Sequence, residues 1–114
     1  MPVWHSRSVL EQAGLTLRRW KVVELPDGAL HLIGYCIENR EGRVSSAVRE
    51  FDYGKLIAKT DTGRVYVLQG EPGSDTHATY VWSRWATLNA VESWEDVSGS
   101  VWSRHEGESR TNAT

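Results

Sequence analysis

Apolar residues alternate with polar ones in short runs between residues 15 and 69, and each run ends at a glycine-containing turn. Runs of this length that are rich in β-branched and aromatic residues predict β-strands, and short connections between them predict antiparallel neighbours. Apolar residues occur at both alternating positions, so we expect a strongly curved sheet or one that is covered on both faces. The five expected strands are residues 17–25, 30–37, 43–51, 55–60 and 64–69.

The period changes from two to 3.6 after residue 73, where apolar residues recur at spacings of three and four. Ser74 or Asp75 is suited to the N-cap, because a short polar side chain there accepts a hydrogen bond from a free backbone N–H. We expect one helix over residues 74–91 with its tryptophans against the sheet, since each buried indole removes on the order of 200 Å² from water. The apolar stripe consists of Ala78, Val81, Trp82, Trp85 and Leu88.

The two ends of the chain carry weaker signals. Ser8 and Glu11 have the spacing of a capping box, which predicts a short helix over residues 8–13. Residues 104–114 are almost entirely polar, so we expect a disordered tail after a single domain of residues 1–103. Together these elements predict an α+β fold: a curved five-stranded antiparallel meander with one long C-terminal helix packed across it.

The composition is that of a small globular protein: 114 residues, 39% hydrophobic and 25% charged, with six tryptophans. Single domains of this length fold without metals or disulfides. The apolar runs are too short for a membrane span, and the first residues lack a basic segment followed by an apolar stretch. We therefore expect a cytoplasmic protein with no membrane partner.

The net charge of −2 is unevenly distributed along the chain. Residues 15–69 contain nine Lys or Arg and seven Asp or Glu, a balance of +2, whereas residues 70–114 contain three and seven, a balance of −4. The sequence therefore lacks the strong basic field that is typical of sequence-independent nucleic-acid binders.

Few residues are suited to catalysis or to metal binding. The four histidines have no second His or Cys at ligand spacing, and the single cysteine, Cys36, lies in an apolar stretch where a buried thiol is expected. The sequence contains no phosphate-binding loop and no nucleophile motif. We therefore expect no metal, no cofactor and no enzymatic activity, and the alternative is a small active site built from His31, Tyr35 and Cys36.

Aromatic and basic residues share one face of the predicted sheet, and two functions could use them. In the first, arginines beside a tyrosine bind a protein partner, because Arg combines bidentate hydrogen bonds with ring stacking. In the second, Tyr35, Phe51 and Tyr66 stack on single-stranded nucleic acid between cations. Pairing of the arginines with nearby carboxylates such as Glu38 and Asp52 would explain them without either function. The candidate partner-binding residues are Arg40, Arg43, Arg49, Arg64 and Tyr66.

Several short stretches carry a likeness to other proteins: residues 42–46, 63–66 with Leu68, Gly70, residues 72–73, and residues 80–82 with Trp85. They resemble small proteobacterial proteins of unknown activity that are carried on chromosomes, plasmids and phages. The likeness spans residues 17–98 and implies an accessory protein of a bacterium or of its mobile elements. It implies no particular activity and no site residues.

From these observations we expect a small non-catalytic binding protein that acts on another protein, as an accessory or an inhibitor in a contest between host and mobile element. A single-stranded nucleic-acid-binding module and a small enzyme of unknown reaction are the two alternatives. Steep salt dependence of oligonucleotide binding would distinguish the nucleic-acid module from the protein-binding protein.

Overall fold

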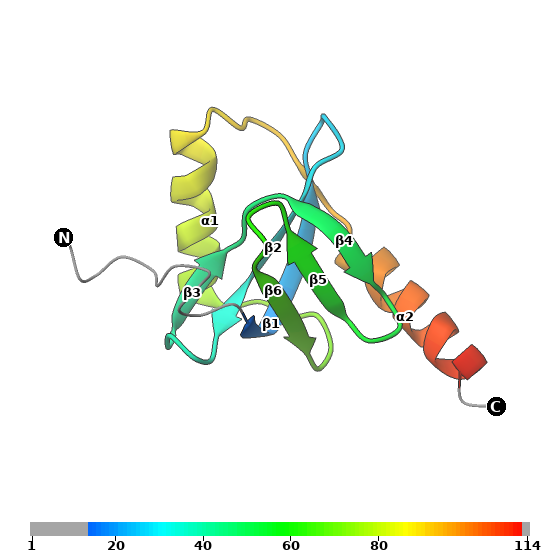
Figure 1. The fold of residues 1–114 in the computed structure, drawn as a ribbon. Coiled ribbons are helices and arrows are strands. Elements are labelled where there is room, and N and C mark those ends of the chain that lie inside the picture. Colours follow the sequence, from blue (N-terminus) through cyan, green and yellow to red (C-terminus); the bar gives the residue numbers. More distant parts are fainter. Residues whose placement is uncertain (1–13, 113–114) are drawn as a thin grey trace.

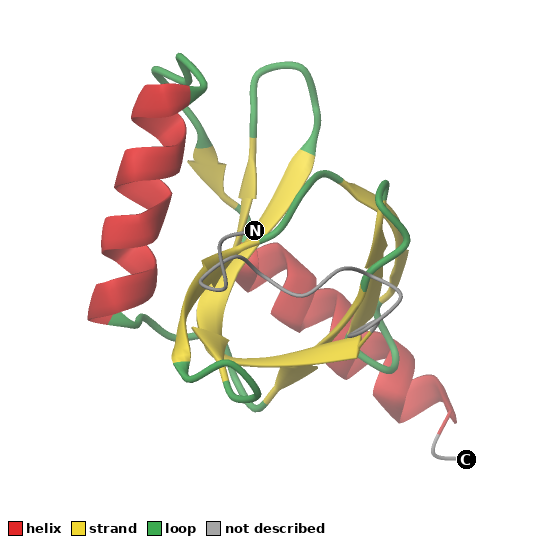
Figure 2. Cartoon of the chain, turned by 60° about the vertical axis from the view of Figure 1, so that its left-hand side comes forward, coloured by secondary structure: helices red, strands yellow, loops and turns green. Residues whose placement is uncertain are grey.

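A strongly curved sheet of seven strands forms the centre of the computed structural model, which describes residues 14–112 (Figure 1). Six strands follow the spatial order β3-β2-β1-β6-β5-β4, and a two-residue strand, β7, pairs with β1. The sheet curls round on itself, with one helix against its outside and the other running behind the curled sheet in the view of Figure 2. The elements are β1 (Gly14–Glu24), β2 (Leu30–Cys36), β3 (Glu41–Val44), β4 (Val48–Asp52), β5 (Ile57–Thr60), β6 (Val65–Gln69), α1 (Thr76–Leu88), β7 (Glu95–Asp96) and α2 (Ser98–Asn112).

The longest strand, β1, pairs with three others: β2 and β7 are antiparallel to it and β6 is parallel. Its pairing with β2 shifts register between Arg18 and Lys21, and Arg19 has a φ of 50°. A bulge of this kind inserts an extra residue and so reverses which alternate positions face inward. The buried residues accordingly change from Leu15 and Leu17 to Trp20 and Val22.

The prediction of an α+β fold is confirmed, but the prediction of a five-stranded meander is wrong. The expected strand over residues 43–51 is two strands, of which β3 pairs with β2 and β4 pairs with β5. Between them Ser45 is buried, its N–H donates to the Leu32 carbonyl, and its Oγ accepts from the Leu32 N–H, both at 2.9 Å. The parallel pairing of β1 with β6 was also not predicted, and β7 is additional to the five expected strands.

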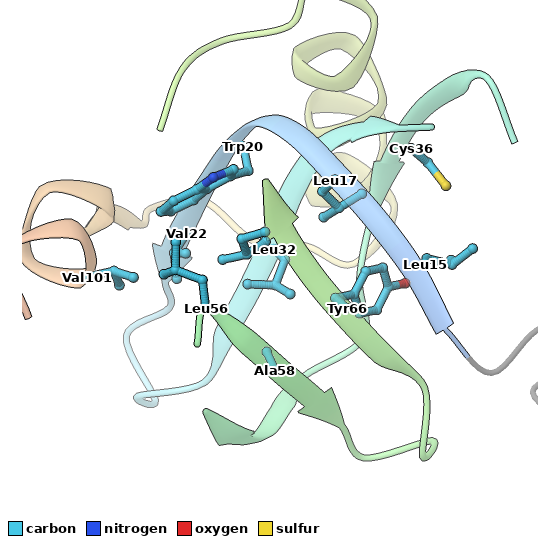
Figure 3. Close-up of a cluster of buried hydrophobic side chains, with 11 residues drawn as sticks. Leu15, Leu17, Trp20, Val22, Leu32, Cys36, Leu56, Ala58, Tyr66 and Val101 are labelled. Carbon is cyan, nitrogen blue, oxygen red and sulfur yellow. The ribbon is translucent and has the colours of Figure 1, made fainter. Parts of the chain in front are cut away.

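The main hydrophobic core fills the inside of the curved sheet (Figure 3). Trp20 is completely buried there, and its Nε1 donates a 3.0 Å hydrogen bond to the Gly70 carbonyl. That bond satisfies the one polar atom of the largest core side chain, whose burial would otherwise carry a desolvation cost. The buried residues of this core are Leu15, Leu17, Trp20, Val22, Leu32, Cys36, Leu56, Ala58, Tyr66, Leu68 and Val101.

Helix α1 packs on the outside of β2 and β3, with a second apolar cluster beneath it. The predicted N-cap is confirmed, because the Asp75 carboxylate accepts from the Ala78 N–H at 2.9 Å. The helix ends at Leu88, which is exposed, rather than at residue 91. The buried residues of the second cluster are Val23, Ile33, Ala78, Trp82 and Ala86.

A second helix, α2, corrects the expectation of one long C-terminal helix followed by a disordered tail from residue 104. Val101 inserts into the main core, and the Ser98 Oγ accepts a 2.9 Å hydrogen bond from the Val22 N–H. Further along, the Arg104 guanidinium lies 4.1 Å from the centroid of the Tyr53 ring. The helix expected over residues 8–13 lies outside the described residues. Over residues 14–112, no helix is both long and apolar enough to span a membrane.

We predict that Gly42→Ala disrupts the contact between β3 and α1. A Cβ at position 42 would meet the backbone of Ala78 and His77, and the Gly42 N–H already donates to His77 Nδ1 at 2.9 Å. Overpacking of this kind costs about 1–3 kcal/mol. Urea unfolding should show this loss, whereas Gly99→Ala, where a Cβ meets nothing within 4 Å, should leave stability equal or higher. Equal stability of the two variants would contradict the packing of α1 described above.

Candidate functional site

The five arginine and tyrosine residues predicted to bind a partner do not form one surface. Tyr66 is 1% exposed and belongs to the main core, and Arg64 is also buried. The Arg43 Nε donates a 2.9 Å hydrogen bond to the Tyr66 hydroxyl, which joins these two residues. Arg40 lies exposed in the turn before β3, and Arg49 lies exposed on β4. The structure therefore brings Arg43 and Tyr66 together, and a binding role for the five residues stays a prediction.

The alternative pairing of these arginines with neighbouring carboxylates is not among the ion pairs of residues 14–112. Those ion pairs join Arg19 to Asp75 at 3.1 Å and Arg104 to Glu108 at 3.0 Å. Arg18 and Arg19, which are not among the candidate residues, lie over the ring of Tyr35, with guanidinium carbons 5.2 and 5.4 Å from its centroid.

Two of the three residues considered for an enzyme site, His31 and Cys36, lie in different environments. His31 is buried under α1, where its Nδ1 lies 2.9 Å from the Ser45 carbonyl and its ring centroid lies 4.7 Å from that of Trp85. Cys36 belongs to the main core inside the sheet. A thiolate and an imidazole in separate clusters cannot form the nucleophile and base of a cysteine enzyme.

The predicted burial of Cys36 is confirmed. Burial raises the pKa of the Cys36 thiol above its ordinary value, and a hydrogen bond from the Asn39 backbone opposes this only in part. The thiol contacts the Glu38 carboxylate at 3.8 Å, and that negative charge also raises its pKa. The thiolate fraction near neutral pH is therefore lower than that of a free cysteine.

We predict that Cys36 reacts slowly with a thiol reagent in the folded protein, because the side chain is buried and its thiolate is disfavoured. The reaction with a chromogenic disulfide should be much slower in buffer than in denaturant, where the same cysteine is exposed. Equal rates under the two conditions would show that the thiol is accessible and would revive the cysteine-enzyme hypothesis.

A hollow lies at one end of the molecule, between the β1–β2 turn and the linker that joins α1 to β7. Figure 1 shows this linker leaving the end of α1 and passing the turn. Two cavities of about 380 and 370 Å³ occupy the hollow, and Leu25, Pro26 and Ser93 line both of them. We call this hollow the loop groove, and its main residues are Leu25, Pro26, Asp27, Glu92, Ser93 and Trp94.

Acidic side chains surround the loop groove. Asp27, Glu92 and Glu95 line it, together with Glu24 at the end of β1. Glu24 and Glu95 are directly opposite each other in the β1–β7 ladder. Like charges at such positions destabilise a sheet, since the two side chains project from the same face at short range. Over residues 14–112, no Lys or Arg forms an ion pair with any of these carboxylates.

Three tryptophans meet beside the loop groove. Trp82 stacks on Trp85 with ring centroids 5.1 Å apart, and it meets Trp94 edge to face at 5.2 Å. Trp82 is 4% exposed, and its buried Nε1 has no hydrogen-bond partner within residues 14–112. Trp94 is 44% exposed, although large aromatic side chains are usually covered. A partly open aromatic cluster with an unsatisfied donor is therefore present at this end of the molecule.

A smaller cavity of about 210 Å³ lies between α1 and the sheet, next to the loop groove. Trp94 lines both hollows, so it stands at their junction. Val23 and Ile33 form an apolar part of the cavity wall, and Lys21 and Asp96 contribute opposite charges to it. The arrangement suits a ligand with both an apolar group and polar atoms. We call this space the tryptophan cavity.

The sequence contained a signal for this site. Trp94 is a large apolar residue in the acidic run of residues 92–96, in the part of the chain that carries the negative balance. Tryptophan is among the residues that are enriched at protein interfaces. The hollow itself depends on the approach of the β1–β2 turn to the linker, which no local pattern predicts.

Comparison with protein-family models gives no match to this chain, and neither the curated proteins nor the solved structures match it. Function therefore has to be inferred from the site itself. In the part of the chain that the structure describes, no three His, Cys, Asp or Glu side chains are placed to hold a metal ion.

Proposed function

We propose that this protein is a non-catalytic binding protein whose target is another protein, and that the target binds at the loop groove. The supporting observation is Trp94, which is 44% exposed where the groove meets the tryptophan cavity. Tryptophan is among the residues that contribute most to protein interfaces, because a large rigid ring becomes desolvated in one step. The Trp94 ring is already about half covered and lines two adjoining cavities, so it is suited to that role.

The two alternatives receive less support from the same residues. A nucleic-acid module would need its phosphates near cations, and the loop groove is lined by carboxylates instead. The aromatic platform expected on the sheet is divided, because Tyr66 is buried and Phe51 stacks on Tyr53 with centroids 4.4 Å apart. The cysteine-enzyme site considered above would need His31 and Cys36 to meet, and they lie in different environments.

A binding protein of this size would fit an accessory or inhibitory role in a bacterium or its mobile elements, as the sequence resemblance implies. Inhibition by occlusion needs a preorganised contact surface and requires no catalytic group. The preorganised surface here is the curved sheet with α1 packed on it, and the contact is Trp94 with its acidic surroundings.

We predict that a photo-crosslinking phenylalanine analogue at position 94 captures a specific protein from a lysate of the source cells. The same analogue at position 80 is the matched control, because Tyr80 is 59% exposed on α1 but does not line the loop groove. Gel electrophoresis with mass spectrometry should show a discrete adduct for position 94 alone. Identical adducts at both positions, or none at position 94, would contradict binding at the groove.

A further inference from the structure

We propose that the target presents an extended segment that lies beside β7, with basic side chains alternating with apolar ones. This inference rests on the proposed function and specifies the chemistry of the target. Two features of the free protein carry it: the opposed carboxylates of Glu24 and Glu95, and the unsatisfied Nε1 of Trp82. They lie on either side of Trp94, which lines both hollows.

The opposed glutamates indicate a cationic ligand. Glu24 and Glu95 face the loop groove from adjacent strands, and neither forms an ion pair within residues 14–112. Asp27 and Glu92 add negative charge along the same groove. An ammonium or guanidinium group placed among them removes the repulsion, and the exposed ring of Trp94 can stabilise the same cation through its π face.

The indole of Trp82 indicates that this ligand also carries hydrogen-bond acceptors. The Nε1–H group is a donor only, it is buried, and it has no acceptor among the described residues. An edge-to-face contact with Trp94 at 5.2 Å gives it at most a weak interaction with a ring. A metal ion or a polyamine has no acceptor to offer, whereas a polypeptide backbone offers one carbonyl per residue.

The geometry of β7 indicates how one segment reaches both features. This strand pairs with β1 on one side, and within the described residues its other edge has no strand partner. Opposed pairs alternate between faces, so Glu24 and Glu95 face the loop groove while Val23 and Asp96 face the tryptophan cavity. An extended segment added at this edge places alternate side chains on the same two faces.

The alternation of side chains between these two faces determines the sequence that we expect for the bound segment of the target. Basic residues on one face meet the glutamates, and small apolar residues on the other enter the tryptophan cavity between Val23, Ile33 and Trp82. Lys21 and Asp96 at the border of that cavity balance each other, so they favour neither charge there.

Calorimetric titration with capped six-residue peptides tests this proposal. An alternating lysine–valine peptide should bind, and its affinity should fall as salt is raised. An alternating glutamate–valine peptide should not bind, and a lysine–valine peptide with the two residue types in separate blocks should bind more weakly. The indole N–H resonance of Trp82, assigned with Trp82→Phe, should move with the alternating peptide and stay in place with spermine, a cation without carbonyl groups.

A double variant, Glu24→Gln with Glu95→Gln, tests whether binding depends on the carboxylates of the groove or on the overall negative charge of the protein. It should weaken binding of the alternating peptide roughly three- to tenfold, since exposed ion pairs each contribute modestly. It should also raise the melting temperature, because the repulsion in the ladder is gone. The matched control is Glu50→Gln with Glu106→Gln, which removes two exposed carboxylates outside the groove and should leave the affinity unchanged.

Absent binding of the alternating peptide, equal binding of the glutamate peptide, or equal loss in both double variants would overturn this inference. An unmoved Trp82 resonance at saturation would overturn it as well. The proposed function is tested separately by crosslinking at position 94. If a protein is captured there while the lysine–valine peptide does not bind, the groove binds a target of different chemistry.

Discussion

The bulge in β1 between Arg18 and Lys21 determines both the core and the candidate site. Before it, Leu15 and Leu17 face the inside of the sheet, and after it the inward positions are Trp20 and Val22. Without the extra residue, one of these pairs would face outward and the large indole of Trp20 would leave the core. The same shift turns Val23 toward α1, where it belongs to the second cluster and lines the tryptophan cavity.

Much of the fold was predictable because it depends on neighbours in sequence. Turns that contain glycine identified the hairpins β1–β2, β4–β5 and β5–β6, and the stripe at 3.6-residue spacing identified α1 together with its cap at Asp75. The parallel contact of β1 with β6 joins Leu17 to Leu68, residues far apart in the chain, and no local pattern records such a pairing. Helix α2 was missed because its sequence is mostly polar, with Val101 buried in the core and Trp102 packed against it.

The loop groove was not predicted from the sequence, a binding role for the arginine–tyrosine patch stays a prediction, and the reasons are physical. The sequence indicated that an arginine would contact Tyr66, and the Arg43 Nε does donate a hydrogen bond to the Tyr66 hydroxyl. The Tyr66 side chain is buried, however, and is not part of an exposed patch. The alternation of residues along a strand shows which residues share a face of the sheet. The direction in which the sheet curves determines which of the two faces lies inside. Trp94 presented the opposite problem, since it lies outside a periodic segment, and its exposure depends on how the linker crosses the end of β1.

Among the described residues, buried polar side chains form hydrogen bonds almost throughout. The two unfavourable features next to Trp94 are therefore informative. Trp20, Ser45 and Ser98 all have hydrogen-bond partners in the core, whereas Trp82 has none for its Nε1. Glu24 and Glu95 oppose each other one strand position from Val23 and Asp96, which line the tryptophan cavity. Local conflicts that a fold otherwise avoids are expected at functional sites, where a ligand resolves them. Both conflicts adjoin Trp94, so a single ligand that supplies a cation and a carbonyl would resolve them together.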